Sequence, residues 1–441
     1  MDADVIVIGA GAAGLAAARS LAGSSLRVML LEARDRFGGR VWSQDSKPAT
    51  APTELGAEFI HGPARETMAL LHDAGIAALD TGDESWTCAD SGGLQRNTDD
   101  FVSAANIFEA SRDLPRDLSV DQFLRRFEND DRMRAMAIAA RAFVEGFDAA
   151  DPVIASARAI ADEWRSGVDF ASARPLGGYR PMFDRLRDAC LAAGVRSVLS
   201  TVVRRISWGR GFVAVDASGA DGKSVTVHAR AAVVTLPVGV LKHKGDEAEV
   251  VFNPDLPAIK RDALQSIEMG SAVKVALWFR IAFWEQVEDG RYRNSAFFRC
   301  AGQPFPTYWT QFPLRSKLII AWTGGPKAIA LRGVSETERI ERALNGFGSM
   351  FGELALARKE FERGVTHDWD LDPLSRGAYS YVAVGGGDAR AALGTPVDET
   401  LFFAGEAMSV DGQGGTVNGA LETGERAARD AATSLGARHA L

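Results

Sequence analysis

The chain has 441 residues, of which 46% are hydrophobic and 24% charged, a composition typical of a globular protein of about two or three domains. The formal net charge of −8 argues against a nucleic-acid-binding surface, and no apolar run approaches the roughly 18 residues of a membrane-spanning helix. The first strand begins at Asp4, which leaves no room for a signal peptide. We therefore expect a soluble cytoplasmic protein that binds neither nucleic acid nor membrane.

The N-terminal segment has the order of a dinucleotide-binding unit. Residues 4–8 (DVIVI) are typical of a buried parallel strand, three glycines follow at once, and residues 15–21 continue as an alanine-rich helix. Gly9 is expected to make the turn, Gly11 to let the backbone approach a pyrophosphate, and Gly14 to let the helix pack on the strand. The anion would lie at the positive N-terminus of the helix.

A second strand, predicted at residues 27–31, ends in Glu32, roughly twenty residues after the glycines. An acid at this position accepts hydrogen bonds from a ribose diol and favours a free 2′-OH over a 2′-phosphate. The loop that follows, residues 33–40, carries paired glycines and the basic residues Arg34, Arg36 and Arg40. These groups suit a diphosphate.

The three cysteines, Cys88, Cys190 and Cys300, are far apart in the chain. An odd count without CxxC spacing predicts neither a disulfide framework nor a zinc site, and we expect no metal. We expect each cysteine to be a small, buried apolar residue in a reducing compartment.

The rest of the chain alternates between two kinds of pattern. Helical periodicity dominates residues 64–195, as at 120–127 and 133–147, and predicts an inserted helical lobe. Strands are expected at 196–208, 211–215, 225–227, 231–236, 272–279 and 318–322, with a helix at 336–347 and a short strand, a glycine-rich loop and a helix within 401–434. We predict an α/β protein, with a Rossmann-type dinucleotide domain (1–63, 196–251 and 385–441) and an interleaved α+β substrate-binding domain (64–195 and 252–384).

Six ordered motifs resemble the flavin-dependent amine oxidase superfamily, which includes polyamine oxidases, monoamine oxidases and lysine-specific demethylases. They are VIVIGAGAAGLAAARSL with LLEARDRFGGRVWS (5–21 and 30–43), ELGAEFIHG (54–62), AVVTLPVGVLK (232–242), MGSAVKV followed by Phe283-Trp284 (269–284), WDLDPLSRGAYSYVAVG (369–385) and LFFAGEAMSVDGQGGTVNGALETGERAA (401–428). The resemblance runs the whole length of the chain.

This resemblance implies that the dinucleotide is FAD. Residues matching family positions that hold FAD, with their neighbours, form the candidate cofactor-binding set: Gly9, Gly11, Gly14, Glu32, Ala33, Arg34, Gly39, Arg40, Gly56, Ala57, Val203, Gly405, Glu406, Thr416 and Val417. Val203 matches the position whose backbone contacts the adenine. Ala378 lies near the place where monoamine oxidases carry a flavin-linked cysteine, so the resemblance implies noncovalent FAD.

The resemblance also implies four residues of the reaction site. Lys274 matches the lysine that holds a water against flavin N5, Tyr379 matches one aromatic wall beside the flavin, and His61 matches a substrate contact of polyamine oxidases. Thr416 stands where monoamine oxidases place a second aromatic wall, which resembles the demethylases instead. The residues alone also allow a lysine that snorkels to the surface, a packed strand tyrosine and a structural histidine.

The implied function is hydride transfer from the α-carbon of an amine to FAD, with reoxidation by O2 to H2O2. A polyamine or aralkyl amine is the expected substrate class, and the oligomeric state is left open. An L-amino-acid oxidase is the nearest alternative, but it needs a fixed guanidinium for the substrate carboxylate, and Glu58-Phe59 occupies the stretch where such oxidases place theirs. A flavin-bound scaffold or redox sensor without turnover is the second alternative.

Several acidic residues fall in polar loops: Glu58, Asp83, Glu84, Asp99 and Asp100. They either line an acidic entrance for a cationic substrate or form a solvated face. The second interpretation is favoured, because charged residues in polar loops usually face the solvent.

Overall fold

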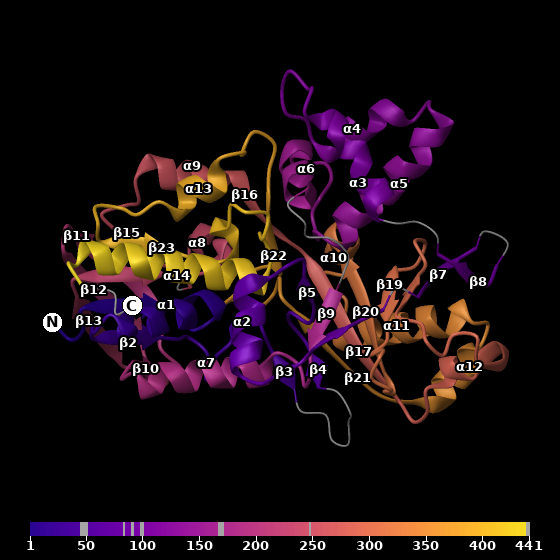
Figure 1. Cartoon of the computed structure of the whole chain (residues 1–441), viewed down its shortest axis with the longest axis horizontal. Coiled ribbons are helices and arrows are strands. Elements are labelled where there is room, and N and C mark those ends of the chain that lie inside the picture. The colour runs from indigo at the N-terminus through magenta and orange to yellow at the C-terminus, as the bar shows by residue number, and fades with distance from the viewer. Residues whose placement is uncertain are drawn as a thin grey trace.

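The computed structural model describes residues 1–44, 52–82, 84–89, 92–97, 101–165, 172–246 and 248–437. Two halves lie side by side along the longest axis, and a helical lobe projects above the second half (Figure 1). The N-terminal strand and the C-terminal helix both belong to the first half, so segments from the two ends of the chain build it together (Figure 1).

A five-stranded parallel sheet forms the centre of the first half. Its order is β10 (Arg196–Val198), β2 (Val28–Leu31), β1 (Val5–Ile8), β14 (Ala231–Val234) and β23 (Leu401–Phe403). In chain order this is 3-2-1-4-5, the arrangement of doubly wound dinucleotide-binding sheets. The apolar runs of β1, β2, β14 and β23 are buried along their whole length, as parallel strands covered on both faces must be.

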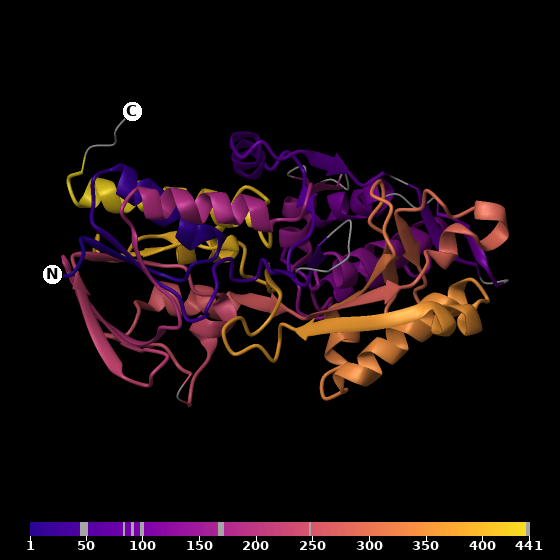
Figure 2. The ribbon, with the colours of Figure 1, turned by 90° about the horizontal axis from the view of Figure 1, so that it is seen from below.

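Different layers cover the two faces of this sheet (Figure 2). Side chains of β1 alternate: Val5 and Val7 pack in the core with α1 (Ala12–Gly23), α7 (Arg180–Ala192) and α14 (Val417–Ser434). Ile6 and Ile8 instead contact the second core, under a sheet of order β13 (Ser224–Ala229), β12 (Phe212–Ser218), β11 (Val202–Gly209) and β15 (Val251–Asn253).

Smaller elements complete the first half. They are α2 (Arg65–Asp73), α8 (Val238–Lys242), α9 (Ala258–Ser266), α13 (Ala389–Gly394) and the 3-10 turn η5 (Glu406–Met408). The packing concerns both boundaries of the predicted segment 64–195, because α2 at its start and α7 at its end lie with α14 and the nucleotide-binding sheet. An apolar helical face does not reveal which of two cores it will cover.

The second half is built on a seven-stranded sheet. Its order is β21 (Phe361–Asp368), β17 (Ala272–Phe279), β20 (Leu318–Gly324), β19 (Thr307–Trp309), β18 (Phe297–Arg299), β7 (Ser85–Cys88) and β8 (Leu94–Arg96). One face packs on α11 (Glu336–Met350) and α12 (Leu354–Glu360) through an aromatic core that includes Phe347. The other face carries Ala276, Trp278 and Trp309.

The helical lobe contains fewer residues than the predicted segment 64–195. It contains α3 (Phe101–Asn106), α4 (Val120–Leu124), α5 (Asp131–Gly146) and α6 (Ala157–Arg165), with the 3-10 turns η1 (Ile107–Ser111) and η2 (Arg125–Phe127). Phe108, Phe123 and Trp164 fill its core. The helix α10 (Gly325–Ile329) contacts α5 and connects the lobe to the seven-stranded sheet.

Short strand pairs join the halves. β16 (Ile267–Gly270) pairs with β22 (Tyr379–Val382), and β3 (Ser43–Gln44) pairs with β4 (Thr53–Glu54). A third small sheet has the order β5 (Ile60–His61), β9 (Ser172–Pro175) and β6 (Ala78–Asp80). Two further 3-10 turns are η3 (Phe283–Glu285) and η4 (Val287–Gly290).

The cysteine expectation was wrong for two of the three residues. Cys88 and Cys300 form a disulfide across a sequence separation of 212 residues, while Cys190 is a buried free thiol in α7, as expected. The parallel pairing of β7 with β18 brings the two cysteines together. The spacing of the cysteines along the chain does not predict this strand pairing. Within the described residues, no group of three or more His, Cys, Asp or Glu side chains suits a metal ion, and no helix is long and apolar enough to cross a membrane.

Candidate active site

A cavity of about 1510 Å³ runs from the glycine turn of the first half to the sheet of the second half. This volume exceeds the roughly 300–1,000 Å³ of a site for a drug-sized ligand, so a dinucleotide and a substrate fit together. Most sequence-predicted residues line it: Gly9, Gly11, Glu32, Ala33, Gly39, Arg40, Gly56, Ala57, His61, Val203, Lys274, Tyr379, Gly405, Glu406, Thr416 and Val417. Gly14 and Arg34 do not line the cavity.

The glycine turn shows why each glycine is present. Gly9 has a φ of +101°, a conformation that L side chains rarely adopt. A Cβ on Gly14 would lie 1.8 Å from the carbonyl oxygen of Gly9, so this position lets α1 pack on β1. A Cβ on Gly11 would meet no atom closer than 3.9 Å, because Gly11 faces the cavity.

The N-terminus of α1 is free to bind an anion. Its N-cap is Gly11, no side chain caps it, and its first turn contains no acidic residue. The unpaired backbone N–H groups and the helix dipole therefore point toward the cavity with partial positive charge. This geometry matches the predicted pyrophosphate site.

Glu32 lies at the carboxyl end of β2 and is buried. Its carboxylate accepts backbone N–H bonds from Ala10 at 2.6 Å and Arg34 at 2.8 Å, and burial raises its pKa. Each carboxylate oxygen has a second acceptor position, so Glu32 retains capacity for ribose hydroxyls. Arg34 Nη2 donates to Asp372 at 2.9 Å and Ser375 at 3.0 Å, and the residue does not line the cavity, so its contact with the cofactor stays a prediction.

Arg40 and Glu406 connect the two ends of the chain at the cavity. Arg40 Nη1 donates to Glu406 Oε1 at 2.8 Å and to the Ala378 carbonyl at 2.8 Å. The other Glu406 oxygen accepts from Ser380 Oγ at 2.6 Å and the Gly415 N–H at 3.1 Å. Burial raises the pKa of Glu406, but the positive charges of Arg40 and Arg390 outweigh it and hold the pKa below its ordinary value. Glu406 therefore stays ionised beside the cofactor cradle.

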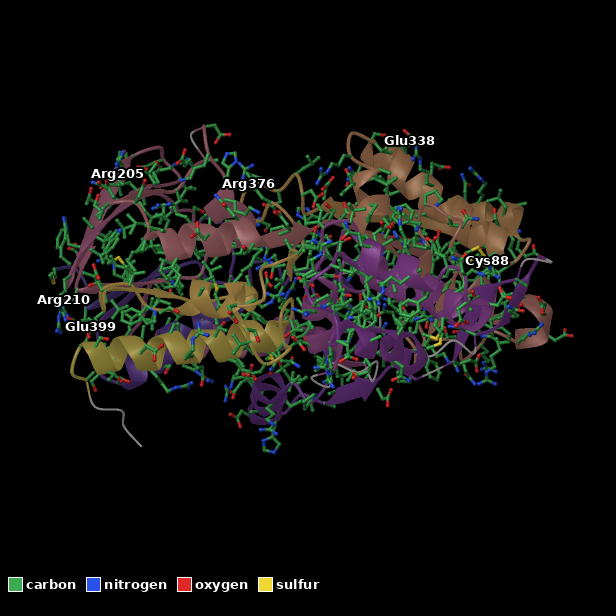
Figure 3. The ribbon with its side chains drawn as sticks, turned by 90° about the horizontal axis from the view of Figure 1, so that it is seen from above. Cys88, Arg205, Arg210, Glu338, Arg376 and Glu399 are labelled. Atoms are coloured by element: carbon green, nitrogen blue, oxygen red, sulfur yellow. A yellow bond between two sulfur atoms is a disulfide. The ribbon has the colours of Figure 1, made fainter. Side chains whose placement is uncertain are left out.

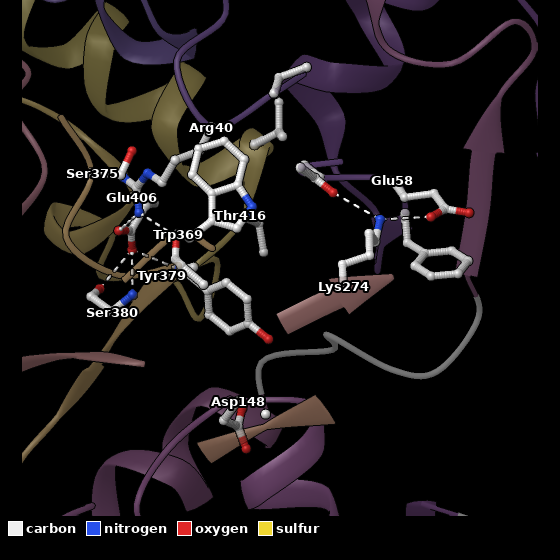
Figure 4. Close-up of a pocket in the computed structure, with 18 of the residues that line it drawn as sticks. Arg40, Glu58, Asp148, Lys274, Trp369, Ser375, Tyr379, Ser380, Glu406 and Thr416 are labelled. Carbon is white, nitrogen blue, oxygen red and sulfur yellow. Dashed lines mark hydrogen bonds and ion pairs between the residues drawn. The ribbon is translucent and has the colours of Figure 1, made fainter. Parts of the chain in front are cut away.

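Lys274 lies on the cavity face of β17, opposite the face that carries Val273 and Val275, as strand alternation predicts. Its side chain is 3% exposed, so it does not snorkel to the surface. The ammonium donates to the carbonyls of Glu54 and Gly56 at 2.9 and 3.0 Å and to Glu58 Oε2 at 2.8 Å. Figure 4 shows the contact with Glu58. All three N–H donors therefore have protein acceptors, and a water on Lys274 would have to share or replace one of them.

Glu58 is buried rather than solvated, so the surface interpretation of this residue was wrong. It accepts from Lys274, from Arg174 Nε at 3.0 Å and from Trp309 Nε1 at 2.9 Å. Burial raises the pKa of Glu58, but Lys274 and Arg174 more than offset this and lower it. Glu84 accepts from Trp86 and Ser295, and Asp83, Asp99 and Asp100 lie outside the described residues.

Tyr379 and Thr416 stand on the first-half side of the cavity, with Trp369 beside them (Figure 4). The Tyr379 hydroxyl donates to the Phe147 carbonyl at 2.5 Å, which fixes the ring, and burial raises its pKa. The Thr416 hydroxyl caps α14 by accepting from the Gly419 N–H at 2.9 Å. Trp369 belongs to the quoted WDLDP motif, yet its place in the cavity wall was missed.

His61 reaches the cavity from β5 among aromatic rings. Phe147 packs edge-on against it with centroids 5.0 Å apart, and Phe59 is tilted at 5.8 Å. Nδ1 has no hydrogen-bond partner in the part of the chain that the structure describes, and burial lowers the pKa of the imidazole to about 4. His61 is therefore neutral near pH 7 and offers a buried polar atom to a ligand.

Two carboxyl groups that sequence reasoning missed also line the cavity. Asp148 follows α5 and accepts from Trp164 Nε1 at 3.1 Å, while Glu163 lies on α6, with Arg390 3.6 Å away. Burial raises the pKa of both groups, to about 7 for Glu163, and the charge of Glu163 raises that of Asp148 further. Neither belongs to a motif, and only the packing of the lobe brings them to the cavity.

The parallel sheet, the uncapped helix N-terminus and the buried acid define a dinucleotide-binding protein, and its cavity extends into a second domain as in flavoprotein oxidoreductases. The model of the flavin-containing amine oxidoreductases matches residues 12–432. The chain therefore belongs to this family, is an enzyme of the flavin-containing amine oxidase class, and uses FAD.

Individual relatives align with nearly the whole chain. Polyamine oxidase 2 of Arabidopsis thaliana is 30% identical over 459 residues, which cover 97% of this chain and 87% of that protein. A solved putrescine oxidase bound to putrescine has a TM-score of 0.81 at 23% identity, covering 98% of this chain and 99% of that one. Cyclohexylamine oxidase from Brevibacterium oxydans has a TM-score of 0.80 at 21% identity, covering 99% of this chain and 100% of that one. Both solved structures have the same fold as this chain.

Proposed function

We propose that this enzyme oxidises small-molecule amines with a second cationic nitrogen, such as diamines and polyamines, and passes the electrons to O2. The observation that carries the proposal is the pair of buried carboxyl groups, Asp148 and Glu163, in a cavity that continues from the FAD cradle. The similarity to polyamine oxidases supports the same substrate class. Bound FAD would accept a hydride from the carbon next to the nitrogen, and O2 would leave as H2O2.

The aromatic part of the cavity prepares the reacting amine. Phe59, Phe147 and Tyr379 line this part, and an apolar environment disfavours an ammonium relative to the neutral amine. Hydride removal needs the nitrogen lone pair, so desolvation assists the reaction. The fixed ring of Tyr379 restricts where the amine can lie.

The acidic part of the cavity would hold the distal ammonium. A cation placed between Asp148 and Glu163 favours their ionised forms and relieves the cost of their burial. Because an acid gains its charge as the pH rises through its pKa, the KM for a diamine should fall as the pH rises through about 7, the pKa of Glu163. A monoamine without the second nitrogen should show a weaker change.

Lys274 would act through its charge. An ammonium near the cofactor stabilises negative charge on reduced flavin and favours reaction with O2. The ion pair with Glu58 holds this charge in an otherwise apolar strand. Its role at flavin N5 stays a prediction.

The same geometry disfavours an amino-acid oxidase. Two arginines near the cavity, Arg174 and Arg40, already bind carboxylates of this chain, Glu58 and Glu406. A substrate carboxylate that used either of these arginines would have to displace its partner. L-amino acids should therefore be poor substrates, and turnover with amines would exclude a flavin-bound scaffold.

The decisive experiment mixes the purified flavoprotein anaerobically with a panel of monoamines, diamines, polyamines and L-amino acids. Bleaching of the flavin by diamines and polyamines, followed by H2O2 release when O2 is admitted, supports the proposal. Bleaching by L-amino acids alone, or by none of these compounds, contradicts it. Asp148→Asn should reduce the preference for diamines, with Asp216→Asn in the second sheet of the first half as a control.

We also propose that FAD is held noncovalently and that the enzyme is cytoplasmic. Position 378 is alanine, Cys190 lies in α7, and Cys88 and Cys300 bind each other, so no thiol of the described residues is placed to form a flavin bond. Acid precipitation should leave all the FAD in the supernatant, and flavin in the washed pellet would contradict this. Imaging of the tagged, full-length protein in its native cells tests the location.

A further inference from the structure

The Cys88–Cys300 disulfide lies at the end of a short strand pairing that forms part of the cavity wall. β7 and β18 are parallel and share three register pairs, Ser85 with Phe297, Trp86 with Phe298 and Thr87 with Arg299. The cysteines are the next residues along each strand, with their Cα atoms 5.0 Å apart. Figure 3 shows Cys88 in the second half, at the opposite end of the molecule from Arg210 and Glu399.

The two faces of this pairing have different surroundings. Ser85, Thr87, Phe297 and Arg299 line the cavity, and Ala301 follows in the same wall. Trp86, Phe298 and the cysteines point to the other face, where they pack with the aromatic core of the second half. The sulfurs therefore lie one residue from the cavity wall without forming its surface.

We propose that Cys88 and Cys300 are a reversible redox-modification site, closed by the hydrogen peroxide that the enzyme itself releases. One thiolate attacks peroxide, giving a sulfenic acid and water; the second thiol displaces water from it, so that two thiols and one H2O2 become one disulfide and two H2O. The two electrons of the thiol pair reduce the peroxide. The inference rests on the proposed function, since that reaction supplies the oxidant.

Closure of the pair has a structural consequence at the cavity. The β7–β18 ladder has three register pairs, and the disulfide covalently links its two strands just beyond the last of them. Reduction should therefore loosen Thr87 and Arg299 in the wall and leave the distant cofactor cradle intact. The expected kinetic effect is a higher KM for long polyamines at an unchanged kcat.

The first test follows the thiols during turnover. The holoenzyme is reduced with dithiothreitol, freed of reductant, supplied with a polyamine in air, alkylated under denaturing conditions at intervals, and analysed by mass spectrometry. The alkylated cysteines should fall from the three of the sequence to Cys190 alone, as peroxide accumulates. Peroxide release with three thiols remaining would overturn the proposal, as would equal closure without the amine.

This design separates the two hypotheses. If no peroxide forms, the proposed function fails, and reagent H2O2 added to the reduced protein still decides whether the pair closes. A Cys88→Ser/Cys300→Ser variant should raise the KM for long polyamines by at least about twofold at constant kcat and FAD content. Cys190→Ser is the matched control, and an unchanged KM in the double variant would contradict the proposal that the disulfide supports the cavity wall.

Discussion

The two ends of the cavity are built in different ways. At the cofactor end, a turn, a helix N-terminus and the acid Glu32 follow one another within residues 5–32, and backbone N–H groups of Ala10 and Arg34 hold the Glu32 carboxylate. At the proposed amine end, the side chains of five separate segments line the cavity: His61, Asp148, Glu163, Lys274 and Tyr379. Substitutions at the amine end should therefore leave FAD binding unchanged, so that substrate selectivity and FAD binding can be altered separately.

The ends also differ in how their charges are balanced. Glu406 and Glu58 each have cationic partners that lower their pKa in spite of burial. Burial dominates at Asp148 and Glu163 and raises their pKa. A carboxylate with cationic partners is held in place by them. The ionised form of an acid that burial disfavours is the form that an incoming cation stabilises most.

The largest expected effect is on turnover. Lys274→Met removes the buried ammonium and should slow turnover by at least about tenfold, a cautious part of the two to three orders of magnitude typical of lost electrostatic stabilisation. Stopped-flow measurement of flavin reduction and reoxidation should find the slower step in reoxidation. FAD content should be retained, and the exposed Lys223→Met is the control. Wild-type turnover would exclude Lys274 from the mechanism, and loss of FAD would make its role structural.

The next effect is confined to the cofactor end. Glu32→Ala removes the acceptor beside the glycine turn and should weaken FAD binding by about 1–3 kcal/mol, or about 5- to 150-fold in Kd. Titration of the apoprotein with FAD, followed by flavin fluorescence, measures this change. The relative rates for different amines should stay the same. Glu399→Ala, at an exposed ion pair, should bind FAD normally, and an unchanged Kd in Glu32→Ala would contradict the fingerprint.

A smaller effect should separate selectivity from cofactor binding. His61→Ala should lower kcat/KM for diamines about tenfold more than for monoamines, the scale of one hydrogen bond to a charged partner, because Nδ1 has no partner among the described residues. Steady-state kinetics with matched amines, together with flavin absorbance, test this. His72→Ala, on the exposed face of α2, is the control. Equal losses for both substrate types would assign His61 a structural role.

The smallest effect is on the pH dependence of stability. Burial lowers the pKa of His61 from 6.5 to about 4, so the unfolded chain binds more protons than the folded protein between these values. His61 therefore makes the wild type lose stability as the pH falls from 6.5 to 4. In His61→Ala this loss should shrink by on the order of 1 kcal/mol, since the cavity partly exposes the ring. Urea unfolding at pH 7.5, 5.5 and 4.5 measures it, and parallel curves for the two proteins would contradict the prediction.

Much of the architecture was predictable because its signals are local. The apolar runs of β1, β2 and β17, the glycine turn and the amphipathic α11 were expected close to their observed bounds. Side-chain alternation correctly placed Lys274 on the face of β17 opposite Val273 and Val275. The resemblance added FAD and the family, which the comparisons bear out.

What the sequence by itself determined was the main apolar strands, the glycine turn and the amphipathic helices, since hydrophobic period and turn residues depend only on neighbours in the chain. The tertiary structure decided the partners: Glu58 with Lys274, Asp148 beside Glu163, α7 on α1, and Cys88 with Cys300. These contacts depend on strand register, on the core that a helix covers and on burial, which residues far apart in the chain set jointly. A side chain's charge and pKa follow from that environment, so the chemistry of the amine end appears only in the folded molecule.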